Sequence, residues 1–303
     1  MKNNLTKNQH YVPRVYLRGW TATGWDHDAE ASRQVMAHFL KQQSSEPRNS
    51  KSILHGKWFY EEDTNEPDNR IEKMFGEHEV SWGGVMSFIT FGAKNARKFY
   101  SEEPSPPISE EQYVCETLAD MFCELPHYVD RIKNFACISY FRTPAALKRK
   151  RNELDHPDVP GGASMAVDLS AFDLASQAMS SSLRDRFKKL NIVLLVAPQS
   201  SFVTSDRPCF DLDLAQNEYT PLLGYDIGRL DTVVAYFALS AMFAVLFVPS
   251  VLKTNTQTRN TPEVKVVSLS AHAVQEFNRL TVKMADEIVV STHEFASIKQ
   301  VVA

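Results

Sequence analysis

The N-terminal segment NQHYVPRVYLRGW holds several side chains that can bind an anion or transfer a proton, among them Gln9, His10, Arg14 and Arg18. On a helix that begins near Pro13, the two arginines lie four positions apart and therefore share a face. Two guanidinium groups on one face suit a phosphate or a carboxylate. We expect His10 to act in catalysis and Gln9 and Arg14 to bind substrate. The alternative is that the segment only anchors the fold.

A pair of carboxylates lies in the segment 70–91. Glu72 and Glu79 are seven residues apart, two turns of a helix, so they share one face with Gly76 and Gly83. Paired carboxylates with room between them can hold Mg²⁺ or Mn²⁺, or act as general acid and base. We expect Glu72 to be catalytic and both glutamates to bind a divalent metal. The alternative is an acidic stripe in solvent, the usual state of a helix's outer face.

The segment FVTSDRP at 202–208 places polar groups at the end of a predicted strand. A carboxylate in that position is held rigidly, as a metal ligand or a general base must be. We expect Asp206 to be catalytic and to bind the metal, and Ser205 to bind substrate. Asp206 could instead cap its own turn through a hydrogen bond to the backbone.

Arg142 lies between aromatic residues and a proline that disturbs the helix, in the sequence YFRTP. We expect it to be catalytic, because an arginine there can stabilise charge that develops during a reaction. An arginine among aromatic side chains can also be buried and paired for purely structural reasons. The chain contains no P-loop, GxGxxG, HExxH or kinase-type motif, and no GxSxG elbow surrounds Ser205.

The predicted helices dominate the first half of the chain. Apolar residues recur at helical spacing in 8–20, 70–91, 110–124, 128–154, 170–190 and 271–287. Prolines break the chain in 101–109 and interrupt the later helices at Pro126 and near Pro144. Ser170 is the predicted N-cap of the helix that follows it.

Strands are predicted mainly in the second half. Short apolar runs occur at 192–197, 202–204, 232–238, 243–248, 264–268 and 288–291. In the first half, 34–40 and 53–60 alternate apolar and polar residues, and 41–51 between them is expected to be a loop. Because helices and strands do not alternate regularly, the sequence predicts an α+β fold with a mixed or antiparallel sheet in its C-terminal half.

The length and composition are those of an ordinary globular protein. Its 303 residues, 43% hydrophobic and 23% charged, are enough for a sizeable core. We expect one compact domain over 1–303, whose best linker candidate, HPDVPGGAS at 156–164, would separate a helical part (1–155) from a sheet part (165–303). A net charge of −4 excludes a general polyanion binder, although a local basic patch would still allow nucleic acid or a nucleotide to bind.

Several features predict a cytoplasmic protein. The N-terminus is polar and lacks the apolar core of a signal peptide. The four cysteines form neither a CxxC pair nor a zinc-site spacing, which favours reduced thiols. The most hydrophobic stretch, 233–251, is about long enough to span a bilayer, but two short strands explain it better. We therefore expect no membrane contact.

Several segments of the sequence, in their order along the chain, resemble those of a bacterial family catalogued as a domain of unknown function, number forty-two thirty-eight. The start at 9–20 is similar to the family's (Q/H)HYVPxFYLRxF, and 205–208 is similar to its SDxP strand end. Weaker similarities lie at 58–60, 70–79, 142–144, 237–240 and 278–291, so the resemblance covers nearly the whole chain. Arg207, Ala238 and Trp20 depart from the usual residues of the family.

The expected function is hydrolysis of a phosphodiester or a nucleotide, as in a nuclease, with the candidate residues converging in one cleft. Carboxylates would hold a divalent metal or act as base, and arginines would clamp the phosphate. The resemblance implies sporadic occurrence among bacteria, which suggests a defence or toxin-type system. The alternative is a non-catalytic protein that binds a nucleotide or a protein partner, or that forms a homo-oligomer.

Overall fold

Helices dominate the first half of the protein, as predicted. The structure is a computed structural model that describes residues 6–22, 24–25, 34–61, 63–155, 169–178, 185, 187–212, 234–249 and 264–294. Its helices are α1 (Arg14–Leu17), α2 (Arg70–Glu102), α3 (Glu110–Glu124), α4 (His127–Phe141), α5 (Pro144–Leu154), α7 (Ala171–Ala178) and α9 (Ala271–Met284).

The longest helix, α2, buries one side along its length. Its buried residues recur at helical spacing and include Ile71, Phe75, Trp82, Val85 and Ile89. Such a stripe is the face that a helix lays on a core. The helix continues past the predicted end at residue 91 to Glu102, because the prolines that break the chain come only after that point.

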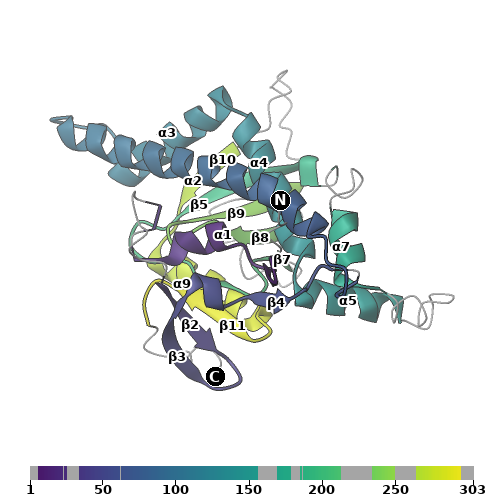
Figure 1. Cartoon of the computed structure of the whole chain (residues 1–303). Coiled ribbons are helices and arrows are strands. Elements are labelled where there is room, and N and C mark those ends of the chain that lie inside the picture. The colour runs from purple at the N-terminus through teal and green to yellow at the C-terminus, as the bar shows by residue number, and fades with distance from the viewer. Residues whose placement is uncertain are drawn as a thin grey trace.

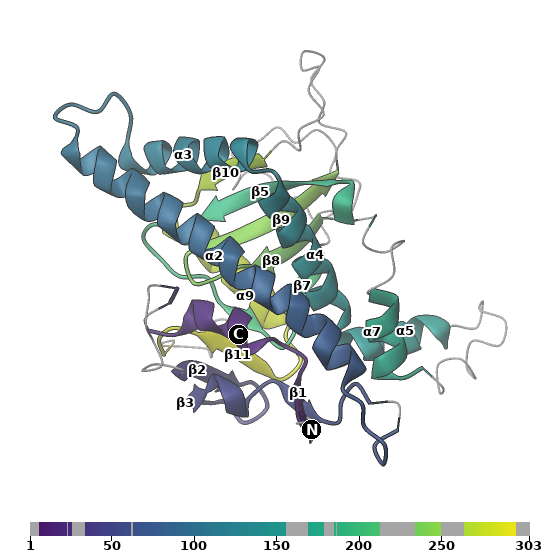
Figure 2. The same ribbon diagram turned by 45° about the horizontal axis from the view of Figure 1, so that its top comes forward.

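A five-stranded sheet forms the centre of the second half, in the order β10-β5-β9-β8-β7. Its strands are β5 (Leu190–Val196), β7 (Cys209–Leu212), β8 (Val234–Ala238), β9 (Phe243–Pro249) and β10 (Val264–Ser268). β10 runs parallel to β5, and the other neighbours are antiparallel, so the sheet is mixed, as predicted. The helices α2, α3 and α4 lie across one face of this sheet (Figures 1 and 2).

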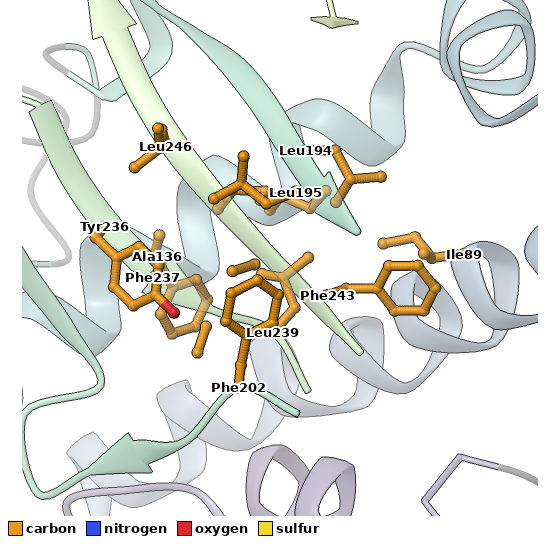
Figure 3. Close-up of a cluster of buried hydrophobic side chains, with 14 of the residues drawn as sticks. Ile89, Ala136, Leu194, Leu195, Phe202, Tyr236, Phe237, Leu239, Phe243 and Leu246 are labelled. Atoms are coloured by element: carbon orange, nitrogen blue, oxygen red, sulfur yellow. The ribbon is translucent and has the colours of Figure 1, made fainter. Parts of the chain in front are cut away.

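Two neighbouring residues of β8 show that both faces of this sheet are covered. Side chains alternate along a strand, so successive residues point to opposite faces. The Phe237 ring lies on the helical side, 5.3 Å from Tyr16 and 5.8 Å from Trp82. The Tyr236 ring stacks on Phe277 of α9 at 5.1 Å on the other side. Figure 3 shows how helix and strand side chains interdigitate in this core.

A second, antiparallel sheet has four strands in the order β3-β2-β11-β6. They are β2 (Gln34–Phe39), β3 (Ser44–Asn49), β6 (Thr204–Ser205) and β11 (Ile288–Ser291). A separate pair joins β1 (Asn8–His10) to β4 (His55–Lys57), also antiparallel. The main hydrophobic core includes residues from Val12 to Val290, so the described residues form one compact α+β unit.

Some predicted elements need correction. Segment 41–51, predicted to be a loop, contains β3, an edge strand that is mostly exposed and therefore lacks the apolar alternation that marks a strand. Its Pro47 is tolerated because an edge strand pairs on one side only. The strand predicted at 53–60 is only the short β4, and β7 was not predicted at all. The predicted linker at 156–164 lies outside the described residues.

Other predictions hold. Ser170 Oγ accepts the N–H of Asp173 at 3.1 Å, as expected of the N-cap of α7. The hydrophobic stretch 233–251 contains the two strands β8 and β9, as predicted. Among the helices of the described residues, none is both long enough and apolar enough to cross a bilayer.

Candidate functional site

Three of the predicted catalytic residues come together around the N-terminal strand. The pairing of β1 with β4 places His10 opposite His55. The first turns of α2 carry Glu72 and Glu79, and Arg142 is the C-cap residue of α4. Elements distant in the chain therefore supply one group of ionisable side chains, with Arg142 at its centre.

Arg142 is buried, with 1% of its side chain exposed. Its Nη1 donates to Glu79 Oε1 at 3.0 Å, and its Nη2 donates to the carbonyl oxygen of His10. Its Nε donates to Tyr60 Oη at 3.4 Å, and the guanidinium carbon lies 4.2 Å from the centroid of the Phe75 ring. The guanidinium is thus engaged on every side inside the protein. A structural, paired arginine describes Arg142 better than a phosphate clamp does.

Gln9 is likewise bonded within the fold. Its Oε1 accepts the N–H of Tyr60 at 2.7 Å, and its Nε2 donates to Glu61 Oε1. The same carboxylate of Glu61 accepts from Asn69 Nδ2 at 2.9 Å, just before α2 begins. Gln9 is completely buried. The Gln9 amide therefore positions β1 against the start of α2, and it has little hydrogen-bonding capacity left for a substrate.

Glu72 has a buried carboxyl oxygen, Oε2, with no hydrogen-bond partner among the described residues. Burial raises the pKa of Glu72 to about 7; the charge of Arg142 opposes the rise, and those of Glu79 and Glu61 add to it. A carboxyl that titrates near neutral pH can both accept and donate a proton under physiological conditions. Glu72 therefore has the properties of a general acid–base group.

The helix surface beside Glu72 is open. A Cβ atom built on Gly76 or on Gly83 would meet no atom within 4 Å. These glycines share the face of α2 that carries Glu72 and Glu79, so the predicted room between the two carboxylates exists. A ligand can approach the helix backbone there without displacing a side chain.

His10 and His55 form a close pair across β1 and β4. Their ring centroids are 5.2 Å apart in an edge-to-face arrangement. Burial first, and then the charges of His55, Arg14 and Arg142, lower the pKa of His10 to about 4. The His10 ring is therefore neutral at physiological pH. His10 Nε2 and His55 Nδ1 are both buried and lack a hydrogen-bond partner in the described part of the chain.

The two N-terminal arginines do not share one continuous helix. α1 ends at Leu17, and Arg18 begins a 3-10 turn, Arg18–Trp20. The Arg18 guanidinium lies over the ring of Trp25, 5.2 Å from its centroid. Arg14 is exposed, and its charge acts on His10. Arg14 therefore remains beside the candidate site, whereas Arg18 contacts an aromatic ring.

Asp206 and Ser205 lie at the end of β6 in the four-stranded sheet. The Asp206 carboxylate accepts three successive backbone N–H groups, at 3.0, 2.7 and 3.1 Å, from Asp286, Glu287 and Ile288. Ser205 Oγ accepts the N–H of Arg207 at 3.1 Å. Both carboxylate oxygens of Asp206 therefore bind the turn that leads into β11. The expected alternative was that Asp206 caps its own turn, whereas the backbone it binds belongs to the turn before β11.

The convergence of all candidate residues in one cleft stays a prediction. Arg142 contacts the His10 backbone and acts on Glu72, whereas the hydrogen bonds of Asp206 go to a different set of partners. Burial raises the pKa of Asp206, although its three N–H donors oppose the rise. Its charge still acts on Tyr11, whose pKa is raised first by burial and then by Asp206. Tyr11, the residue after His10, therefore lies within electrostatic reach of Asp206.

The predicted metal ligands are not gathered into one set. Within the described residues, no group of three or more histidine, cysteine, aspartate or glutamate side chains is placed to hold a metal ion. Glu79 pairs with Arg142, and Asp206 binds backbone. A Mg²⁺ or Mn²⁺ ion at Glu72 and Glu79 would need most of its six ligands from water or substrate.

His55 was not predicted as part of the site. Its signal in the sequence is weak, since 53–60 was recognised only as a strand and its pairing partner was unknown. The register of β1 with β4 is what brings His55 to His10. Residues that meet across strands far apart in the chain carry no local motif.

Helices on one face of a mixed sheet, with ionisable groups gathered around a buried arginine, define an α+β protein with a candidate acid–base site. The chain belongs to the family described as "Protein of unknown function (DUF4238)", whose model matches residues 8–294. The family resemblance found in the sequence is thereby confirmed. No curated protein and no solved structure matches the chain.

Proposed function

We propose that the protein is a hydrolase that cleaves a phosphodiester or a nucleotide, with Glu72 as its proton-transfer group. The observation that carries the proposal is the Glu72 carboxyl, whose Oε2 is buried without a hydrogen-bond partner among the described residues and whose pKa is about 7. The open helix surface at Gly76 supports it, because a substrate has room there. The positive charge of Arg14 favours an anionic substrate.

In this mechanism the Glu72 carboxylate takes a proton from the attacking water while the water oxygen bonds to phosphorus. The bond between phosphorus and the leaving oxygen then breaks. The leaving oxygen receives a proton from the Glu72 carboxyl or from solvent. Arg142 acts as a positioning residue, since it holds His10 and Glu79, and its charge limits the rise in the pKa of Glu72.

A hydrolysis screen of the full chain tests this function. The substrates are bis(4-nitrophenyl) phosphate, RNA, single- and double-stranded DNA and nucleotides, each in EDTA and in Mn²⁺. We expect cleavage of at least one, with a kcat about 100-fold lower for Glu72→Gln. The matched control is Glu77→Gln, an exposed glutamate of the same helix. If the wild type cleaves no substrate, or Glu72→Gln keeps the full rate, the proposal is wrong. Activity that is present in Mn²⁺ and lost in EDTA would indicate that a divalent metal binds at Glu72 and Glu79.

The second candidate is a non-catalytic protein that binds a nucleotide or a partner. The observation that favours it is that Arg142, Gln9 and Asp206 are bonded within the protein, which leaves few of the predicted catalytic and substrate-binding groups accessible. Thermal stabilisation by nucleotides without metal, in the absence of any turnover, would support binding over catalysis. Stabilisation that needs Mn²⁺ and is lost in Glu72→Gln would support the hydrolase.

We also propose a cytoplasmic location. None of the cysteines Cys115, Cys123, Cys137 and Cys209 forms a disulfide. Free thiols persist in reducing compartments. Alkylation of intact cells, followed by mass spectrometry, should find the exposed Cys123 as a thiol; finding it in a disulfide would contradict the proposal.

A further inference from the structure

The histidine pair contains two polar atoms that lack the partners such atoms normally have. His10 Nε2 and His55 Nδ1 are both buried, and neither has a hydrogen-bond partner among the described residues. Buried polar groups are almost always hydrogen-bonded, and an unmade bond costs about 1–3 kcal/mol. Two such atoms on rings 5.2 Å apart therefore indicate a place where a polar ligand binds.

The charges around the pair indicate the sign of that ligand. The groups that act electrostatically on the His10 ring are His55 of β4, Arg14 of α1 and Arg142 after α4, all of which are cationic when charged. Two carboxylates of α2, Glu72 and Glu79, act on Arg142, and neither is among the main influences on His10. Among the described residues, the main charges that act on the His10 ring are therefore positive, which suits an anionic ligand.

The position of the proton on the His10 ring decides whether Nε2 can donate to an anion. A backbone hydrogen bond with Lys51 favours the protonated ring, so the ring donates to that carbonyl group. Because Nε2 has no partner, this bond uses the other ring nitrogen, Nδ1. A neutral imidazole carries a single N–H. His10 Nε2 therefore has a lone pair in the free protein and must gain a proton before it can donate to an anion.

We propose that His10 and His55 form the phosphoryl-binding subsite of this protein, and that binding of the phosphate group is coupled to uptake of one proton by the pair. The proton adds to a ring nitrogen lone pair, and the new N–H donates to a phosphoryl oxygen. No covalent bond of the ligand changes in this step. The inference rests on the proposed function, because it assigns a binding place to the phosphate group of the substrate.

Calorimetry on the full chain tests the proposal, with dimethyl phosphate and sulfate as probes because neither titrates near neutral pH. Titrations at pH 7.5 in two buffers of different ionisation enthalpy give the number of protons taken up. We expect one proton per bound anion and an affinity that rises about tenfold for each unit fall in pH. Binding without proton uptake, or no binding of either probe, overturns the proposal.

Variants locate the site. His10→Gln and His55→Gln should each weaken binding at least tenfold, and His127→Gln, which changes an exposed histidine on α4, should not. Wild-type affinity in both pair variants would overturn the proposal. Circular dichroism checks the fold of each variant. If a variant does not fold, the proton uptake measured on the wild type still tests the proposal.

The two proposals fail separately. Glu72→Gln should lose hydrolysis and still take up one proton when it binds dimethyl phosphate. If the protein binds dimethyl phosphate with proton uptake but hydrolyses no substrate, then the hydrolase proposal is wrong and the proposed subsite remains. If hydrolysis depends on Glu72 but is unchanged in His55→Gln, and binding takes up no proton, then the proposed subsite is wrong and the hydrolase proposal remains.

Discussion

Arg142 at the end of α4 and Glu79 in α2 form an ion pair at 3.0 Å, in which the arginine side chain is 1% exposed and the glutamate 26%. The same guanidinium donates to the carbonyl oxygen of His10 in β1. A buried guanidinium that loses its partner is costly, since its charge then remains without compensation. This one side chain therefore ties two helices to the strand that carries the candidate site.

Replacement of Arg142 should be strongly destabilising. We expect Arg142→Ala to lower the free energy of unfolding by about 3–5 kcal/mol, because it removes the pair and the bonds to His10 and Tyr60. Arg142→Lys should recover only part, since an ammonium group cannot reproduce the guanidinium's planar set of bonds. Urea denaturation measures both. Arg131→Ala, at an exposed arginine of α4, is the control and should cost less than about 1 kcal/mol. A similarly small loss for Arg142→Ala would contradict the role assigned to it.

Glu72 should make stability depend on pH. Its pKa is about 7 in the folded protein against an ordinary 4.5, so the folded state holds the proton more tightly. This contribution is fully present below pH 4.5 and is lost as pH rises through 7. Glu72→Gln should therefore be more stable than the wild type at pH 8, by up to about 3 kcal/mol, and nearly equal to it at acid pH. Urea denaturation at several pH values measures the difference. An identical pH profile for wild type and variant would show that the carboxyl is not shifted.

Asp206 should act in folding. Asp206→Ala leaves three backbone N–H groups without their acceptor and should cost about 2–4 kcal/mol. Asp206→Asn should cost less, because its amide oxygen can still accept. Chemical denaturation gives the stability, and calorimetry with dimethyl phosphate gives the binding of the folded protein. Loss of binding in a variant of unchanged stability would return Asp206 to the functional site.

The open surface of α2 can be tested at Gly76. Gly76→Ala should stabilise the helix by about 0.5–1 kcal/mol, because the added Cβ has free space around it. Gly76→Leu should keep the stability but lower hydrolysis by about tenfold or more, since its side chain occupies the approach to Glu72. The control is Gly84→Leu, where a Cβ contacts Arg131 Nη1 at 3.7 Å. Full activity in Gly76→Leu would mean that the substrate does not use this surface.

Local signals predicted most of the helices. Pro126 is the N-cap of α4, Pro144 is the first residue of α5, and Ser109 caps α3 by accepting the N–H of Gln112. Such signals act within a few residues, so they can be read without knowing the rest of the fold. Strand β3 escaped prediction because an exposed edge strand has no apolar face to reveal it.

The candidate site was predicted only in part. His10, Glu72 and Arg142 were named from residue type and position, and the structure gathers them. The sequence did not predict His55 or the backbone partners of Asp206, since both depend on strand pairing. β1 with β4 and β6 with β11 are partners far apart in the chain.

The α+β composition, the helix limits set by prolines and caps, and membership of the family can be read from the order of residues along the chain. Which ionisable groups meet, and which are already bonded, depends on how the elements pack together. The pairing of β1 with β4 placed His55 beside His10, and burial raised the pKa of Glu72. Periodicity in a sequence shows which face of an element is buried, but not which element covers it. The chemistry of this site depends on which elements pack against its ionisable side chains.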